Sequence, residues 1–360
     1  MGKRTAIIHD WLNGMRGGEK VLEKLLDIFP NADIFTLFLD RDNISEKIRN
    51  KTIYTSPLNR FAMIRNRYRY FLPLFPKFIE DFNLEGYDIV ISSSHCVAKG
   101  IVPHPDSKHI SYIHSPMRYA WDQYYSYFGK MKGIKKKVIR SRISKLRQWD
   151  VTSNDRVDHF IANSSFVKER IRRYYRRDSV VIHPPVDTDY FTPDKNSYED
   201  YFLTVSALVP YKKVDTLIEV FNKTEDRLVI VGKGPEEKSL KRMAKGNIEF
   251  KKNLSDEELK TVYRGSRAFV YGGIEDFGIT FVEAQSCGIP VISFGVGGIT
   301  DIVNKENGIL YNRGDVIGLL EAVEEFKGRQ FNSDTIRSSA LRFSTENFYK
   351  NFETFLKTIS

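Results

Sequence analysis

Two glutamates around a glycine form the pattern with the most chemical content. Glu275 and Glu283 stand on either side of Gly278, and the segment 279–286 after the glycine predicts a helix. The first amides of a helix have no partners within it and carry partial positive charge, so they can bind phosphate. We therefore predict that a diphosphate binds at the amides of Gly278, Ile279 and Thr280.

The two carboxylates would contact what this phosphate carries. Glu275 lies on the loop before the predicted helix and would stand beside the group attached to the diphosphate. Glu283, about one turn inside the helix, can accept hydrogen bonds from two neighbouring hydroxyls, as a ribose offers. The alternative is an acidic surface loop followed by a glutamate on a helix face, with no ligand.

A pair of lysines follows another predicted strand. Lys212 and Lys213 stand between the predicted strand 201–205 and the predicted helix 214–221. A lysine there would point to the same edge as Glu275 and neutralise a departing diphosphate; the alternative is a solvated lysine pair. Glycine turns at Gly232 and at 297–298 would line the same pocket, although such turns are common after strands.

The first half of the chain carries a glycine pair of its own. Gly17 and Gly18 follow the predicted strand 5–9 and open a predicted helix, and paired glycines allow close approach of a ligand to the main chain. The surrounding sequence is neither the dinucleotide fingerprint nor a Walker loop, so neither NAD nor ATP is implied. A plain tight turn explains the pair equally well.

His114 ends the predicted strand 109–113 and would face the same edge, where it can hydrogen-bond a sugar hydroxyl or stabilise charge. A structural histidine is the alternative. The other histidines lack the spacing of metal ligands, so we predict no metal and no other cofactor. These histidines are His9, His95, His104, His109, His159 and His183.

The elements that position these residues alternate between short β-branched strands and amphipathic helices. Such alternation predicts an α/β protein with parallel sheets, and a break near Pro184 and Pro185 predicts two Rossmann-like domains facing a central cleft. We place the domains at 1–186 and 187–342, with a terminal helix after residue 343. Ligands of such sheets bind outside the carboxyl ends of the strands, which places the expected site between the domains.

Composition fits this reading and adds a charge asymmetry. The chain has 360 residues and a net charge of +10. Residues 1–186 hold 33 basic and 19 acidic residues, a net charge of +14, so residues 187–360 have a net charge of −4. Two cysteines favour a reducing compartment, and no apolar run is long enough to span a membrane. We expect a cytoplasmic protein.

Two basic and aromatic segments, 56–82 and 117–149, interrupt the alternation. Interleaved cations and aromatic rings are typical of docking on anionic lipid, so we expect peripheral binding to the inner face of the cytoplasmic membrane. Solvated helices are one alternative. A nucleic-acid-binding protein is another, but the sequence contains no recognised nucleic-acid motif and we predict no such partner. The predicted docking residues are Arg67, Arg69, Lys135, Lys136 and Lys137.

Together these motifs resemble the retaining glycosyltransferases of family four, which have the two-Rossmann GT-B fold. The resemblance covers nearly the whole chain and is closest to bacterial and archaeal mannosyltransferases of O-antigen assembly. It rests on the paired glutamates, the glycine pair, Lys212, and the segments HDWL at 9–12, RGGEK at 16–20, ALVPYK at 207–212, SCGIPVI at 286–292 and NGIL at 307–310.

The resemblance implies a role for each matching residue. Glu275 would contact the transferred sugar, Lys212 and Gly18 the diphosphate, Glu283 the ribose, and His114 the donor sugar. The amide of Phe277 would join those of residues 278–280 at the diphosphate. The terminal helix would cross back to the first domain. Most family members carry an arginine shortly before the lysine, where this chain has Ala207. Either Lys213 or an arginine of the other domain would substitute, or the phosphate would be held more weakly.

The implied reaction moves a hexose, with mannose from GDP-mannose as the first choice, to a lipid-linked or polysaccharide acceptor in cell-surface glycan assembly. Configuration would be retained by front-face attack, in which the donor phosphate takes the acceptor proton. The alternatives within the fold are a nucleotide-sugar epimerase and a phosphorylase.

Overall fold

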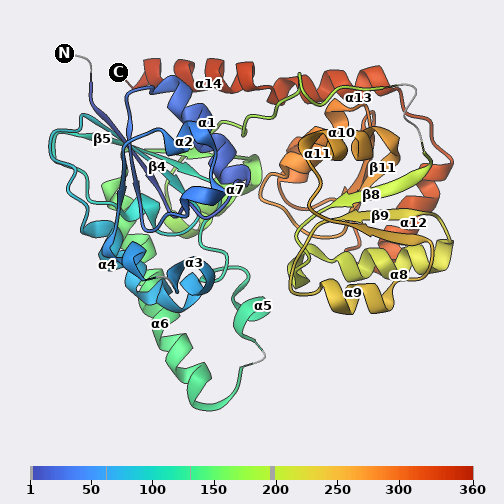
Figure 1. Ribbon diagram of the computed structural model, residues 1–360, viewed down its shortest axis with the longest axis horizontal. Coiled ribbons are helices and arrows are strands. Elements are labelled where there is room, and N and C mark those ends of the chain that lie inside the picture. Colours follow the sequence, from blue (N-terminus) through green and yellow to red (C-terminus); the bar gives the residue numbers. More distant parts are fainter. Residues whose placement is uncertain (1–2, 62, 130, 195–198, 360) are drawn as a thin grey trace. The chain divides into compact units, whose positions relative to one another are not determined.

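The computed structural model describes residues 3–61, 63–129, 131–194 and 199–359, and only the main chain of residues 66, 69 and 126 (Figure 1). Residue contacts divide the chain into unit 1, which ends at His183, and unit 2, which begins at Pro184. This division lies three residues before the boundary that the sequence suggested. The terminal helix belongs to unit 2 by its contacts, and its crossing to the first domain stays a prediction.

Within the described residues, unit 1 contains one parallel sheet of seven strands in the order β3-β2-β1-β4-β5-β6-β7. Successive strands along the chain are joined mostly by helical segments, as parallel pairing requires. The strands are β1 (Thr5–His9), β2 (Asp33–Thr36), β3 (Ile53–Thr55), β4 (Ile89–Ser94), β5 (Lys108–Ile113), β6 (His159–Ala162) and β7 (Val180–Val181).

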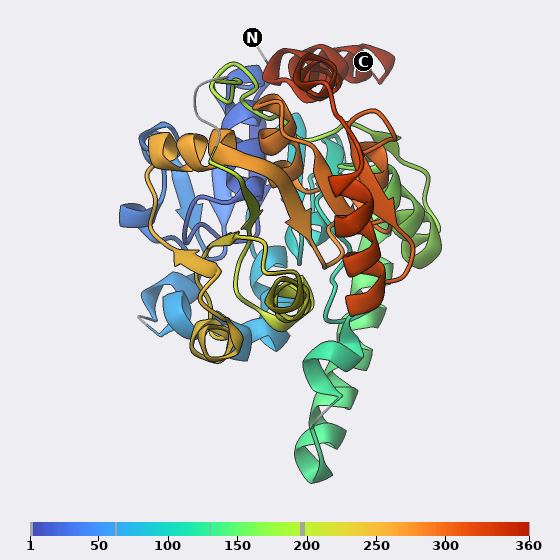
Figure 2. The ribbon, with the colours of Figure 1, turned by 90° about the vertical axis from the view of Figure 1, so that its right-hand side faces the viewer.

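The helices of unit 1 follow the apolar faces that the sequence offers. The first helix, for example, buries Val21, Leu22, Leu25 and Leu26 on one side. The described helices are α1 (Gly17–Ile28), α2 (Glu46–Arg49), α3 (Ile64–Arg67), α4 (Phe75–Glu80), α5 (Tyr124–Phe128), α6 (Gly133–Thr152) and α7 (Ser165–Tyr175). Figures 1 and 2 both show α5 and the start of α6 extending away from the sheet of this unit.

Unit 2 contains, in its described part, a parallel sheet of six strands in the order β10-β9-β8-β11-β12-β13. Side chains of β8 alternate between two apolar cores, one on each face of the sheet, because successive residues of a strand point to opposite sides. The strands are β8 (Tyr201–Val205), β9 (Leu228–Val231), β10 (Ile248–Lys251), β11 (Ser266–Tyr271), β12 (Val291–Phe294) and β13 (Gly308–Tyr311).

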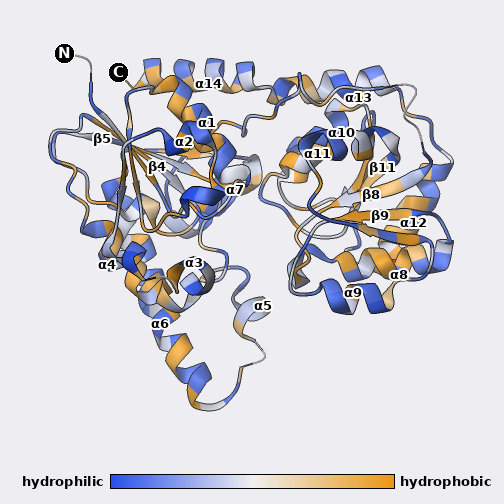
Figure 3. Ribbon diagram, viewed as in Figure 1, coloured by the Kyte–Doolittle hydropathy of each residue, from blue (hydrophilic) through white to orange (hydrophobic). Residues whose placement is uncertain are grey.

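Helices cover both faces of the second sheet, whose strands appear as hydrophobic segments in Figure 3. Several begin with a capping side chain; Ser255, for example, caps α10 in a capping box with Glu258. The described helices are α8 (Val214–Thr224), α9 (Glu237–Met243), α10 (Asp256–Gly265), α11 (Ile279–Ser286), α12 (Val316–Lys327), α13 (Ser333–Ala340) and α14 (Thr345–Thr358).

The predicted strand–helix alternation is confirmed, with local differences. The apolar run 33–39 forms a strand only to Thr36, because Leu37 and Phe38 are buried as a loop whose main chain bonds to the loop after β1. Apolar character alone does not separate a buried loop from a strand. Strand β3 and helices α2, α7 and α13 were not among the predicted elements.

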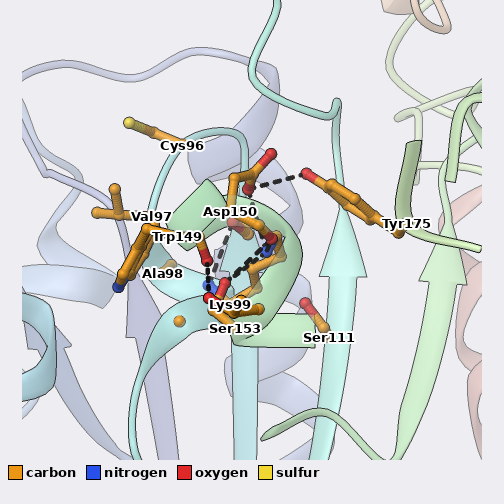
Figure 4. A network of polar contacts seen from close by, with 12 residues as sticks. Cys96, Val97, Ala98, Lys99, Ser111, Trp149, Asp150, Ser153 and Tyr175 are labelled. Carbon is orange, nitrogen blue, oxygen red and sulfur yellow. Dashed lines mark hydrogen bonds and ion pairs between the residues drawn. The ribbon is translucent and has the colours of Figure 1, made fainter. Parts of the chain in front are cut away.

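A buried ion pair holds the end of α6 against the sheet of unit 1 (Figure 4). Lys99 follows β4, and its Nζ lies 3.0 Å from Oδ1 of Asp150 on α6. The same ammonium donates to Ser153 Oγ at 2.8 Å, and the hydroxyl of Tyr175 donates to Asp150. Both charged side chains are almost fully buried, and burial lowers the pKa of Lys99.

Replacing Lys99 by methionine should destabilise the protein by about 3–5 kcal/mol, because it leaves the Asp150 carboxylate buried without a cation. Urea unfolding of purified protein measures this loss. Lys47→Met is the matched control, because Lys47 pairs with Asp27 at the surface and its loss should cost about 1 kcal/mol or less. Equal losses in the two variants would contradict the structural role of the buried pair.

Candidate functional site

The order of strands reverses direction at the β8–β11 pair in unit 2 and at the β1–β4 pair in unit 1. In parallel sheets the loops on the two sides of such a reversal separate, and ligands bind at the gap they leave at the carboxyl ends of the strands. We therefore take these two places, one in each unit, as the positions of the candidate site.

In unit 2 this position holds a Lys–Glu ion pair. Lys212, on the loop after β8, donates to Oε1 of Glu275, on the loop after β11. The hydroxyl of Tyr271, the last residue of β11, donates to the same oxygen. The lysine and glutamate side chains are 13% and 16% exposed, so the pair is sheltered but open to a ligand. The structure thus brings together the two side chains that were predicted to carry the main chemistry.

Close contact with glycine fixes the loop that carries Lys212. A Cβ atom on Gly273, just after β11, would lie 2.8 Å from the carbonyl oxygen of Tyr211 and 3.1 Å from the Cα of Lys212. Gly232 behaves in the same way, because a Cβ there would lie 1.9 Å from the carbonyl oxygen of Ser206. Only glycine permits these approaches, so the turn at Gly232 shapes the main chain next to the predicted donor pocket.

A second glycine pair fixes the loop that carries Glu275. The amide of Gly298 donates to the carbonyl oxygen of Glu275 at 2.8 Å, and Glu275 and Gly297 form an isolated parallel bridge. A Cβ on Gly298 would lie 2.2 Å from the carbonyl oxygen of Asp276. The sequence suggested that these glycines line the donor pocket; in the structure their main chain contacts the loop that carries Glu275.

The predicted phosphate site lies at the start of α11. Gly278 precedes the helix with φ +100°, and a Cβ there would lie 2.2 Å from the ring of Phe281. The side chain of Phe277 packs in the core, and the helix begins with Ile279 and Thr280, whose main-chain amides lie in its first turn. This geometry suits an anion, as helix N-termini generally do.

Glu283 lies deeper than a freely accessible helix-face residue would. Its carboxylate is nearly buried, and Oε2 accepts a hydrogen bond of 2.9 Å from the hydroxyl of Tyr263. Its contact with a ribose stays a prediction. Lys213 adopts the left-handed conformation at φ +57° and begins α8 directly beside Lys212.

In unit 1 the glycine pair and the predicted histidine lie together. Gly17 and Gly18 open α1, and a Cβ on Gly18 would lie 3.7 Å from Nε2 of His114, which follows β5. This nitrogen forms a hydrogen bond of 2.8 Å with Ser93 Oγ. Burial, and after it the neighbouring His95 and His9, lower the pKa of His114 to about 3, so the imidazole is neutral near pH 7.

Sequence reasoning missed four polar residues around this histidine. His9 shares Ser93 Oγ with His114, at 3.1 Å from its Nδ1, and lies 3.8 Å from Glu19. Asp10 pairs with His95. The signal was available, because Asp10 and His95 each follow a parallel strand directly, but the histidines were assessed only as metal ligands. Among the described residues, no group of His, Cys, Asp and Glu could hold a metal ion.

Two family models together match almost the whole chain, one over each half. Residues 17–190 match the family described as Glycosyltransferase Family 4, and residues 185–338 match the family described as Glycosyl transferases group 1. The chain belongs to this family of glycosyltransferases.

Curated relatives match parts of this glycosyltransferase. A GDP-mannose-dependent alpha-mannosyltransferase of Corynebacterium glutamicum is 31% identical over 192 residues, which are 50% of this chain and 46% of the relative. The O-antigen chain mannosyltransferase RfbU of Salmonella typhimurium is 30% identical over 168 residues, which are 43% of this chain and 47% of the relative. The chain spans about half the length of the curated relatives it matches.

Solved structures match over their full length and confirm the predicted GT-B fold. The lipopolysaccharide outer core galactosyltransferase WaaB has a TM-score of 0.70 at 19% identity, covering 99% of this chain and 100% of that chain. Anabaena Alr3699/HepE in complex with UDP-glucose has a TM-score of 0.73 at 15% identity, covering 98% and 99%. At these identities the likeness concerns the fold alone.

Gly298→Ala should destabilise the glycosyltransferase by about 1–3 kcal/mol, because the added methyl group meets a main-chain oxygen of the acidic loop. Gly246→Ala is the matched control, since a Cβ there meets nothing within 4 Å, and it should change stability by about 0.5 kcal/mol or less. Urea denaturation of both variants measures the difference. A Gly298→Ala protein as stable as the control would show that the contact does not fix the loop.

Proposed function

We propose that this glycosyltransferase moves a hexose from a nucleotide-diphosphate sugar to a hydroxyl of an acceptor, with retained configuration. The observation that carries the proposal is the Lys212–Glu275 pair beside the start of α11, at the strand-order reversal of unit 2. A cation, helix amides and a carboxylate at one edge suit a ligand that has a diphosphate next to a sugar.

In this proposal the main catalytic contribution is electrostatic. Negative charge develops on the diphosphate as the sugar leaves, and Lys212 with the amides of Gly278, Ile279 and Thr280 would stabilise it. The donor phosphate would take the acceptor proton, and because these groups supply the positive charge we propose that no metal is needed.

The carboxylate of Glu275 would then bind hydroxyls of the transferred sugar. Its Oε1 already accepts from Lys212 and Tyr271, so the carboxylate is held in one orientation before the donor binds. From unit 1, the neutral His114 is the proposed partner of a donor sugar hydroxyl, because a neutral imidazole both donates and accepts hydrogen bonds.

For the donor and acceptor we propose GDP-mannose and a lipid-linked or polysaccharide glycan. Support comes from the relatives, one of which is described as GDP-mannose-dependent and another as an O-antigen chain mannosyltransferase. A thermal-shift screen of GDP-, UDP- and ADP-sugars tests the donor directly, because a bound ligand stabilises the folded state.

Glu275→Ala and Lys212→Ala should each lower sugar transfer by about a hundredfold or more while the protein stays folded. Lys212→Ala should also weaken GDP binding, because the cation that faces the diphosphate is lost, whereas Glu275→Ala should leave GDP affinity nearly unchanged. Transfer of radiolabelled mannose and calorimetry with GDP separate the two effects.

Lys251→Ala is the control for these variants, because Lys251 forms a surface ion pair with Glu249 in the same unit. It should transfer at the wild-type rate. Near-normal turnover in both site variants would refute the assignment of the site.

We also propose that unit 1 docks on an anionic membrane surface. The first turns of α6 are exposed and carry Lys135, Lys136 and Lys137 beside Ile134, whose side chain is 81% exposed. In α5, Tyr125 is 82% exposed. Exposed apolar groups among cations are the composition that binds lipid headgroups and dips into the interface.

The segment before α4 has the same character. Phe61, Met63 and Tyr70 are exposed there, as is Arg67 at the end of α3, while the side chain of Arg69 lies outside the described part. None of the helices in the described ranges combines the length and apolar character needed to span a bilayer.

Replacing Lys135, Lys136 and Lys137 by glutamate should weaken binding to vesicles that contain phosphatidylglycerol by about a hundredfold, since each basic residue contributes about 1 kcal/mol at such a surface. Co-sedimentation with anionic and neutral vesicles measures this. The control replaces three exposed lysines of unit 2 by glutamate, namely Lys223, Lys238 and Lys305, and so changes the net charge of the protein by the same amount. If wild-type protein binds neutral and anionic vesicles alike, the electrostatic part of the proposal fails.

A further inference from the structure

A second charged pair occupies the strand-order reversal of unit 1. Asp10 follows β1 directly and His95 follows β4 directly, and these two strands are neighbours in the sheet with His9 opposite Ser93. Nδ1 of His95 lies 3.0 Å from Oδ2 of Asp10. The pair therefore holds, in unit 1, the place that Lys212 and Glu275 hold in unit 2.

The carboxylate of this pair is fixed and inaccessible. Asp10 is completely buried and accepts hydrogen bonds of 2.6–2.9 Å from four main-chain amides, those of His95, Cys96, Val97 and Ala98. Burial alone would raise the pKa of Asp10, but His95 and these donors hold it well below its ordinary value. Asp10 is thus a permanent anion that orients its neighbour and cannot itself reach a ligand.

The imidazole of His95, in contrast, reaches the surface. Its side chain is 34% exposed. The imidazole packs edge-to-face with the ring of Trp11, with centroids 4.5 Å apart and an interplanar angle of 82°, and this contact sets the plane of the imidazole. Nδ1 of His95 faces Asp10, and among the contacts of His95 with the described residues none involves Nε2. Packing alone does not explain why a buried carboxylate, that of Asp10, faces Nδ1 of a partly exposed histidine.

The charges packed around His95 favour its protonated form. Burial lowers the pKa of His95, but Asp10 and then Glu19 on α1 raise it, Arg16 opposes them, and the net direction is upward. His114 on the neighbouring loop is neutral, and His9 of β1 is paired with Glu19. The cation faces the end of the sheet at which Gly17 and Gly18 open α1.

We propose that His95, oriented by Asp10, is a further ligand-binding residue of unit 1 that donates its Nε2–H to a phosphate oxygen of a substrate. The inference rests on the proposed function, because it assigns a partner within the same reaction. A phosphate fits better than a neutral hydroxyl, since a cation backed by a fixed anion forms its strongest hydrogen bond with an anionic oxygen. The phosphate belongs either to the nucleotide donor or to a lipid diphosphate that carries the acceptor.

The direct test observes the imidazole without requiring catalysis. In protein with ¹⁵N-labelled histidine, the Nε2 resonance of His95 is followed by NMR while GDP or a short prenyl diphosphate is added. A response to GDP alone identifies the donor as the source, and a response to the prenyl diphosphate alone identifies the acceptor carrier. No response to either compound overturns the proposal, whether or not the protein transfers sugar.

The kinetic test uses His95→Gln, which keeps a side-chain donor and removes the charge. We expect kcat/KM for the substrate identified by NMR to fall about ten- to a hundredfold. The wild type should lose activity as pH rises through the raised pKa of His95, because deprotonation removes the cation, and this limb of the pH profile should vanish in the variant. A merely structural role would lower activity without removing the limb.

The matched control is His104→Gln, because His104 also lies beside an aspartate, Asp106, but at the surface of the same unit. It should keep the wild-type rate and pH profile. Asp10→Asn is less informative, since its amide would face four N–H donors and disturb folding. A His95→Gln enzyme with wild-type kcat/KM and pH profile would overturn the proposal, whereas absent transfer with an intact NMR response would refute only the proposed function.

Discussion

The reversal of strand order in each parallel sheet is the constraint on which the sites depend. At the β8–β11 pair the chain leaves the sheet in opposite directions, so the loops that follow both strands meet at one edge and leave room between their first turns. Lys212 and Glu275 meet because of this topology, although 63 positions separate them in sequence. The same reversal at β1–β4 brings Asp10 to His95 across 85 positions.

Topology brings the loops together, and glycine sets their distance. At Gly273 and Gly298 the main chains of two loops touch at distances that no Cβ atom allows. These main-chain contacts hold the loops that carry Lys212 and Glu275. Rigid support under an open charged edge is the condition for holding a diphosphate without rearrangement.

Much of this site could be predicted from the sequence, because its residues lie at fixed distances from strands and helices that apolar patterns reveal. Glu275, Gly278 and Lys212 all stand next to such elements. Asp10 and His95 also directly follow strands, but that their side chains meet depends on which strands are neighbours, and strand order is a tertiary property that periodicity does not contain. The short length of β3 and the buried loop after Thr36 escaped prediction because local pattern does not separate them from coil or strand.

The helix α6 combines a buried anchor at its end with an exposed basic start. Its last turns face the core through Ile143, Leu146 and Asp150, and the buried pair of Asp150 with Lys99 fixes them to the sheet. Its first turns are solvated and carry the lysine run. Part of the excess positive charge of the first half of the chain therefore lies on the exposed first turns of α6. The last turns of the same helix are anchored, because moving them would expose the buried Asp150 carboxylate.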